Sequence, residues 1–219
     1  VVIPARTTVS RPVHLVFVST CADEALATHP RNLIVVGEGS RVAVVEAFLS
    51  VGGGVYLTNA VTEIVGGSGA TIDYYKLEQE SSTSFHVATV KANLGCDASF
   101  TSHTFSGGAA LARNDLSVFL DGEGSHCNLE GLFIVDGHRL VDNHTEIDHR
   151  KPHSTSRELY KGILSGHAQG VFNGAIKVRE DAQKTNAVQH SKNLLLSENA
   201  QINTKPQLEI RADDVRCAH

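Results

Sequence analysis

Two side chains that can bind soft metals, Cys217 and His219, lie one residue apart in the terminal segment LEIRADDVRCAH. The segment has a strand pattern, and side chains at positions i and i+2 of an extended segment point to the same face. We therefore expect Cys217 and His219 to face one metal ion or one partner surface. The alternative is that Cys217 packs as a small hydrophobic residue and His219 is a frayed terminal residue.

A second group of possible ligands lies between residues 136 and 153. The group consists of His138, His144, His149 and His153 together with Asp136, Asp142, Glu146 and Asp148. Spacings of 6, 5 and 4 residues put the four histidines on no common strand face, although His144, Glu146 and Asp148 alternate onto one. We expect these side chains to serve turns and hydrogen bonds between neighbouring strands, with a metal-delivery site as the alternative.

The remaining cysteines, Cys21, Cys96 and Cys127, are scattered and form neither a disulfide scaffold nor a paired C-x-x-C motif. That usage is typical of a reducing compartment. Free cysteines pack more often than they react, so we expect these three thiols in the core.

Composition excludes several functions. The chain of 219 residues is 41% hydrophobic and carries 19 basic against 24 acidic residues, for a net charge of −5. It has no Lys/Arg-rich run, which argues against nucleic acid or an anionic membrane as a partner. No apolar run reaches membrane-spanning length and no signal peptide opens the chain. We expect a cytoplasmic globular protein.

A loose internal repeat organises the chain. Each unit has a turn rich in Gly, Asp or Asn and then an alternating apolar run, as in GEGSRVAVVEAF from Gly37 and GSGATIDYYKL from Gly67. The units align on Gly39, Gly69, Asp97, Gly124, His167 and Asn199, at steps of 30, 28, 27, 43 and 32 residues. Alternation with period two indicates strands, and steps near 30 residues are typical of solenoids.

These features predict an all-β fold, a right-handed parallel β-helix that spans residues 1–219 as one core domain. The 43-residue step is expected to hold one coil and an inserted strand pair. SRELYKGILSG, from Ser156 to Gly166, has some helical propensity, but strand patterns flank it and we expect a strand. An immunoglobulin-like sandwich is the alternative fold, and the absence of Trp disfavours it.

The ends of such a solenoid expose unpaired backbone groups. The last strand pattern, QLEIRADDV, has no cap after it, so we expect a missing domain or a second chain to cover that end. By itself the chain is expected to form a homodimer through the edge around Leu208 to Val215. The absence of Met and the start at Val1 indicate a processed or partial chain.

Several long motifs carry a resemblance to a known family. They are RNDLSVFLDGEG from Arg113, GLFIVDGHRLVDNHTEIDHRKPHSTSRELYKGIL from Gly131, GVFNGAIKVREDAQKTNAVQ from Gly170 and NLLLSENAQINTKPQLEIRADDVRCAH up to His219. In this order they resemble the core domain of the SufB/SufD family of iron-sulfur cluster assembly proteins. Within that family, the terminal CAH resembles the SufD type.

The resemblance implies a non-catalytic scaffold. It implies a β-helix core whose flanking N-terminal and C-terminal helical regions are missing here, pairing with SufB through the C-terminal strands of the core, and docking of the ATPase SufC on the missing C-terminal domain. A transient iron-sulfur cluster would form at the SufB interface, with His219 as the principal ligand and Cys217 as a further candidate. Imidazole can replace thiolate at some cluster irons, and a mixed site binds less permanently than four thiolates.

Two other classes of function are compatible with a β-helix. One is an enzyme acting on acidic polysaccharide, which would line one sheet with carboxylates and Lys or Arg. The other is a purely structural solenoid. Export signals are typical of the first class, and this sequence shows none.

Overall fold

The structure, a computed structural model, describes residues 1–20 and 25–219. Within those ranges no residue is helical, and the strands form one sheet of nine strands and one of eight. The prediction of an all-β fold is confirmed, and the segment Ser156 to Gly166 lies in a strand and the turn after it.

Each coil of the chain contributes one strand to each sheet. Sheet A consists, in spatial order, of β1 (Val2–Ile3), β4 (Arg31–Val36), β6 (Tyr56–Gly66), β8 (Phe85–Leu94), β10 (Leu111–Leu120), β12 (Leu140–His149), β14 (Gln169–Val178) and β16 (Gln201–Ile210), with β3 (Leu26–Thr28) also beside β6. Sheet B consists of β2 (Val13–Ser19), β5 (Arg41–Ser50), β7 (Thr71–Gln79), β9 (Ser99–Ser106), β11 (His126–Val135), β13 (Thr155–Leu164), β15 (Asn186–Leu195) and β17 (Arg216–Ala218).

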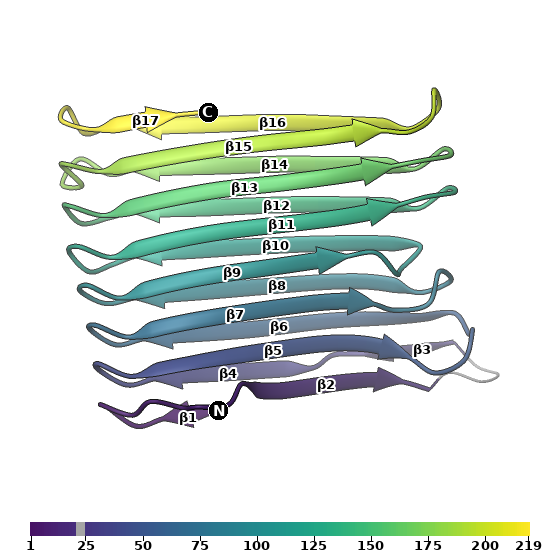
Figure 1. The fold of residues 1–219 in the computed structure, drawn as a ribbon, viewed down its shortest axis with the longest axis horizontal. Helices are drawn as coiled ribbons and strands as arrows, with labels where there is room; N and C mark the ends of the chain where they lie inside the picture. The colour runs from purple at the N-terminus through teal and green to yellow at the C-terminus, as the bar shows by residue number, and fades with distance from the viewer. Residues whose placement is uncertain (21–24) are drawn as a thin grey trace.

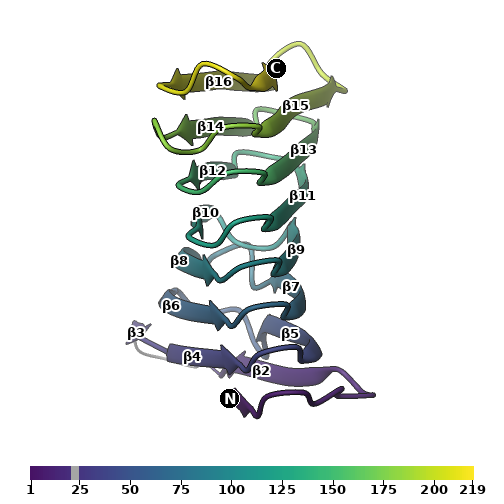
Figure 2. The same ribbon diagram turned by 90° about the vertical axis from the view of Figure 1, so that its left-hand side faces the viewer.

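All pairings between the described strands are parallel. The strands of sheet B run from left to right in front, the strands of sheet A return behind them, and the chain climbs from the N-terminus to the C-terminus (Figure 1). This sense of winding is a right-handed parallel β-helix. Figure 2 shows the two sheets from the side, as two columns of stacked strands.

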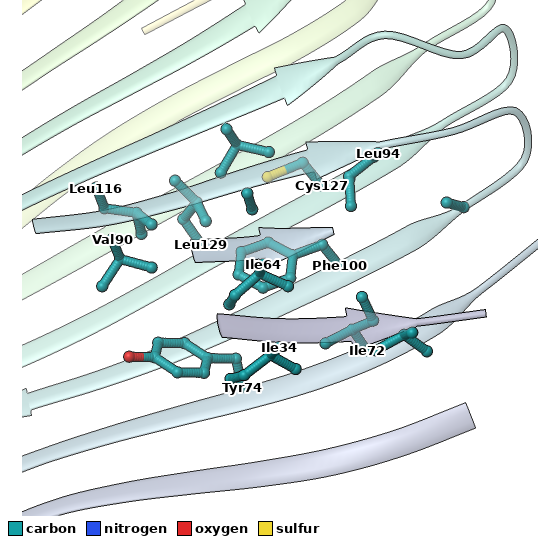
Figure 3. Packing of buried hydrophobic residues seen from close by; sticks show 14 of the residues in the cluster. Ile34, Ile64, Ile72, Tyr74, Val90, Leu94, Phe100, Leu116, Cys127 and Leu129 are labelled. Atoms are coloured by element: carbon teal, nitrogen blue, oxygen red, sulfur yellow. The ribbon is translucent and has the colours of Figure 1, made fainter. Parts of the chain in front are cut away.

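Alternation along each strand decides which residues form the core. In β10, for example, every second residue is buried and the others are partly exposed. Because neighbouring strands pair without a shift in register, inward residues stack in columns, such as Val42, Ile72, Phe100 and Cys127 in sheet B. Figure 3 shows how such columns pack against each other between the sheets. Burying a large aliphatic or aromatic side chain stabilises the fold by about 1.5–3 kcal/mol.

The turns before the sheet B strands repeat one backbone conformation. A residue with positive φ occurs there at Gly39, Gly69, Asp97, Gly124, His153 and Lys184, at steps of 30, 28, 27, 29 and 31 residues. The prediction of an inserted strand pair in the 43-residue step is therefore wrong. His167 lies in the opposite row of turns, before β14, and the residue that continues the row after Gly124 is His153.

The last coil of the solenoid ends in a short strand of three residues, β17. The predicted continuous strand QLEIRADDV is interrupted, because β16 ends at Ile210 and the backbone turns before Arg216. β17 then returns to sheet B, where only Arg216, Cys217 and Ala218 pair with β15. Beyond this short strand, the end of the solenoid next to β15 and β16 is open (Figure 1).

Candidate ligand site at the open end of the solenoid

Cys217 and His219 both lie at the open end, but in different surroundings. Cys217 is in the middle of β17, opposite Ala187 of β15. It is half-buried and packs against an apolar cluster that includes Ile176 and Val178 of β14. Burial raises the pKa of the Cys217 thiol, which favours the protonated form over the thiolate that binds metals.

His219 follows β17 and is exposed to solvent. Its side chain lines a cavity of about 200 Å³ at the mouth of the solenoid. The other walls are Phe172, Thr204 and Pro206 from sheet A and Gln189, His190 and Ser191 from sheet B. Cys217 packs against the core, and His219, two residues further on, lines the cavity, so a shared role for the two residues stays a prediction.

One residue that lines this cavity, Gln189, is polar and buried, and no motif in the sequence singles it out. Gln189 is 1% exposed, and its Nε2 donates a hydrogen bond of 2.9 Å to Oε2 of Glu158 one strand below. Glu158 is fully buried, and burial raises its pKa to about 7, while the hydrogen bond from Gln189 acts in the opposite direction. The inward column of Val44, Tyr74, Ser102 and Leu129 continues with Glu158 and Gln189, directly before the open end.

The histidines between residues 136 and 153 do not converge. His138 and His153 lie in turns, as predicted, and the ring of His138 stacks on His167 with centroids 4.7 Å apart. His144 lies on the outer face of β12, with its Nε2 2.9 Å from Asp142 Oδ1. His149 is buried on the inner face.

Hydrogen bonds explain the buried position of His149. Its two ring nitrogens lie 2.7 Å from the hydroxyl oxygen of Ser154 and 2.9 Å from that of Ser156. Burial lowers its pKa to about 4, against the effect of the neighbouring Asp148. The prediction of turn and hydrogen-bonding roles is confirmed for His138, His149 and His153.

The other two described cysteines, Cys127 and Cys96, differ in burial. Cys127 is 4% exposed and packs in the core, as predicted, and burial raises its pKa well above the ordinary value. Cys96 is exposed in the turn between β8 and β9, so the prediction of core packing is wrong for this residue. The turn needs no apolar side chain at that position. Cys21 lies outside the described residues.

No three His, Cys, Asp or Glu side chains in residues 1–20 and 25–219 are arranged to hold a metal ion together. The described chain also contains no helix long and apolar enough to cross a membrane.

These features define a right-handed β-solenoid with a cavity at an open end, which is lined by His190, His219 and the buried side chain of Gln189. The family model for the SufBD core domain of the SUF system of FeS cluster assembly matches residues 17–219. The chain therefore belongs to the SufB/SufD family of iron-sulfur cluster assembly proteins.

Its relatives carry related names. The chain is 34% identical, over 99% of its length, to an iron-sulfur cluster assembly SufBD family protein of Synechocystis. It is 34% identical, over 96% of its length, to the iron-sulfur cluster assembly protein SufD of Escherichia coli, and 29% identical, over 99%, to SufD of Bacillus subtilis. In each case the match covers 50% of the relative, so the chain spans about half the length of these proteins.

Proposed function

We propose that this chain is a SufD-like scaffold that pairs with SufB, and works with the ATPase SufC, to build and transfer nascent iron-sulfur clusters. The observation that carries the proposal is the exposed imidazole of His219 at the open end of a solenoid of this family. The relatives named SufD in Escherichia coli and Bacillus subtilis support the SufD-like assignment.

The cluster is cargo, and the proposed role of His219 is to bind one of its irons. A neutral imidazole is a good ligand for iron, and replacing a thiolate by an imidazole weakens the hold of a site on a cluster. A scaffold must release what it assembles, so a mixed ligand set suits it. The described part of this chain holds no group of three or more His, Cys, Asp or Glu side chains that could bind a metal ion, and we propose that thiolates of SufB complete the set.

Cys217 is proposed as a second ligand that acts only when its surroundings change. Its thiol packs against Ala187 and the apolar cluster, and burial disfavours the thiolate. β17 is held by three residues on one side only, so displacement of this short strand by a partner would bring Cys217 out beside His219.

The surface for SufB is proposed to be the open end. β16 is a ten-residue strand with one unpaired edge, and exposed edges of this kind accept a strand from another chain. SufC is proposed to bind outside residues 1–219, and ATP hydrolysis would be its task, which leaves this chain a non-catalytic, cytoplasmic component.

No feature of the described chain favours the polysaccharide-enzyme alternative. Sheet A does carry carboxylates and cations on its outer face, but they pair with each other. Arg113 bonds Asp115 at 2.7 Å and Asp142 at 2.5 Å, and Lys177 bonds Glu146 at 2.8 Å. Such pairs between neighbouring strands stabilise a sheet, and they engage the carboxylates of Asp115, Asp142 and Glu146.

The test is reconstitution of the complex with iron and sulfide, followed by ultraviolet-visible absorption. His219→Ala should abolish cluster formation while SufB binding and the melting temperature persist, because the residue lies outside the core. His190→Ala, a second histidine at the rim of the cavity, is the matched control and should assemble cluster normally.

Cys217→Ala tests whether Cys217 acts as a second ligand, and we expect a partial loss of cluster formation. His149→Ala should lower the melting temperature instead, because that side chain is buried. If His219→Ala assembles cluster at the unmodified rate with SufB bound, the terminal CAH motif is structural and the proposed ligand role is wrong.

A further inference from the structure

Gln189 holds a buried acceptor atom for which the fold provides no partner. Its side chain is 1% exposed, and Oε1 has no hydrogen-bond partner among residues 1–20 and 25–219. Leaving such an atom unsatisfied costs about 1–3 kcal/mol, and buried polar groups in native proteins are almost always paired. The same side chain lines the cavity that His219 borders. A buried acceptor without a partner, on a residue that lines a cavity, is a candidate ligand atom.

The amide is fixed in one orientation. A carboxamide has one donor end and one acceptor end, and the carboxylate of Glu158 takes the donor end, Nε2, at 2.9 Å. The acceptor oxygen must then face away from Glu158. Gly174 on sheet A makes room for this arrangement, because a Cβ at that position would lie 1.4 Å from Gln189 Nε2.

The strand register brings this oxygen next to the imidazole. Val188 of β15 pairs with Ala218 of β17, so the following residues, Gln189 and His219, continue the same two neighbouring strands. Paired strands lie about 4.8 Å apart. Gln189 and His219 therefore follow two paired positions of neighbouring strands, and both residues line the same cavity.

We propose that Gln189 Oε1 is a second ligand, beside His219, for a borderline divalent cation such as iron(II) at the mouth of the solenoid. The inference rests on the proposed function and adds to it a residue of this chain. Imidazole nitrogen and carbonyl oxygen together suit a cation between the soft and hard classes. Both ligands are neutral, so the ion keeps its charge and most of its water, and it is released readily to an incoming thiolate.

The hydroxyl of Thr204, in the opposite wall of the cavity, is a third oxygen within this space. The sequence gives no hint of such a site, because no metal motif contains a lone Gln.

The test uses cobalt(II) as a spectroscopic probe for iron(II), with the whole chain. Visible absorption gives the affinity of the chain for cobalt(II). Gln189→Leu removes the oxygen at nearly constant volume and should weaken binding at least about tenfold. His219→Ala should weaken binding at least as much.

Two further variants test whether the position of the Gln189 amide matters for binding. Asn193→Leu is the matched control, because Asn193 lies on the inner side of the same strand with an unpartnered buried oxygen but outside the cavity wall, and it should bind cobalt(II) like wild type. Gly174→Ala changes no ligand yet pushes against the amide, so it should weaken binding as Gln189→Leu does. Circular dichroism and melting temperatures check that each variant is folded.

The outcomes separate the two proposals. Loss of binding in both His219→Ala and Gln189→Leu supports the inference. Loss in His219→Ala with unchanged binding in Gln189→Leu overturns the inference and leaves the proposed function intact. Unchanged binding in His219→Ala, or loss in His190→Ala instead, contradicts the ligand role in the proposed function. A wild-type chain that binds no cobalt(II) also overturns the inference, because the two ligands are preformed without a partner.

Discussion

The ammonium nitrogen of Lys76 lies 2.7 Å from Nε2 of His86, with both side chains buried between the two sheets. Lys76 also donates to Oδ1 of Asn114 at 2.7 Å, and His86 Nδ1 lies 2.7 Å from Oε2 of Glu80. An ammonium can only donate, so His86 accepts at Nε2 and carries its proton on Nδ1, toward Glu80. A chain of hydrogen bonds thus links the two sheets through a neutral histidine.

The first prediction is that Lys76→Met changes the pH profile of stability. Burial lowers the pKa of Lys76 to about 8 from 10.5, although nearby carboxylates, Glu78 first, oppose this. Between these values the unfolded chain binds more protons than the folded chain, so this group makes the wild type more stable as pH rises from 8 to 10.5. The gain over Lys76→Met should reach about 3 kcal/mol, measured by urea unfolding.

At neutral pH the same variant should be less stable than wild type, because it removes the donor to His86 Nε2 and Asn114 Oδ1 and leaves two buried acceptors unpaired. Parallel pH profiles for wild type and Lys76→Met above pH 8 would contradict the assigned pKa.

How far the sequence predicts this fold depends on the kind of signal. Alternation is a local pattern, so the strands and the solenoid class follow from it, even for the segment Ser156 to Gly166 with its helical propensity. The positions of the turns are harder to predict from the sequence. His153 and Lys184 adopt positive φ, a conformation that sequence reasoning assigns to Gly or Asn, so the repeat was misaligned beyond Gly124.

The candidate site was predictable only in part. Cys217 and His219 carry recognisable ligand chemistry, but the surroundings of each depend on where β17 pairs, which is a long-range contact. Gln189 becomes relevant only through its register with His219 and its contact with Glu158, and neither can be obtained from local sequence.

A second prediction concerns Glu158 and His149, whose effects on stability oppose each other. Burial raises the pKa of Glu158 from 4.5 to about 7, so the folded chain binds more protons in that range and the contribution of this group falls as pH rises. Burial lowers the pKa of His149 from 6.5 to about 4, so the contribution of this group is lost as pH falls through that range.

Each single variant should reveal the pH dependence of stability that the remaining group contributes. In Glu158→Gln the histidine remains, and stability should decrease by about 3 kcal/mol as pH falls from 6.5 to 4, relative to a His149→Gln Glu158→Gln double variant. In His149→Gln the carboxyl remains, and stability should decrease by a similar amount as pH rises from 4.5 to 7. Denaturant unfolding at five pH values decides this; slopes of the same sign in both single variants would refute it.

The third prediction concerns the close contact between Gly131 and Tyr160 on neighbouring strands of sheet B. A Cβ at Gly131 would lie 2.2 Å from the ring of Tyr160, which is buried beside it on β13. Gly131→Ala should therefore lower the free energy of unfolding by about 1–3 kcal/mol. Gly53→Ala is the matched control, because a Cβ there meets nothing within 4 Å, and its stability should stay within about 0.5 kcal/mol of wild type. Equal stability of the two variants would show that Tyr160 moves freely.

The last prediction is that the isolated chain dimerises weakly through its open end. β16 has an unpaired edge and Ile210 is 43% exposed, but Lys205 and Pro206 on the same strand interrupt that edge, and such residues oppose pairing. Ile210→Lys places a charge at this exposed position and should give a monomer in sedimentation experiments. Leu132→Lys, on the outer face of β11, should dimerise like wild type. A wild-type chain that stays monomeric at every concentration would mean that Lys205 and Pro206 suffice to block the edge, and that a partner must supply more than a strand to bind there.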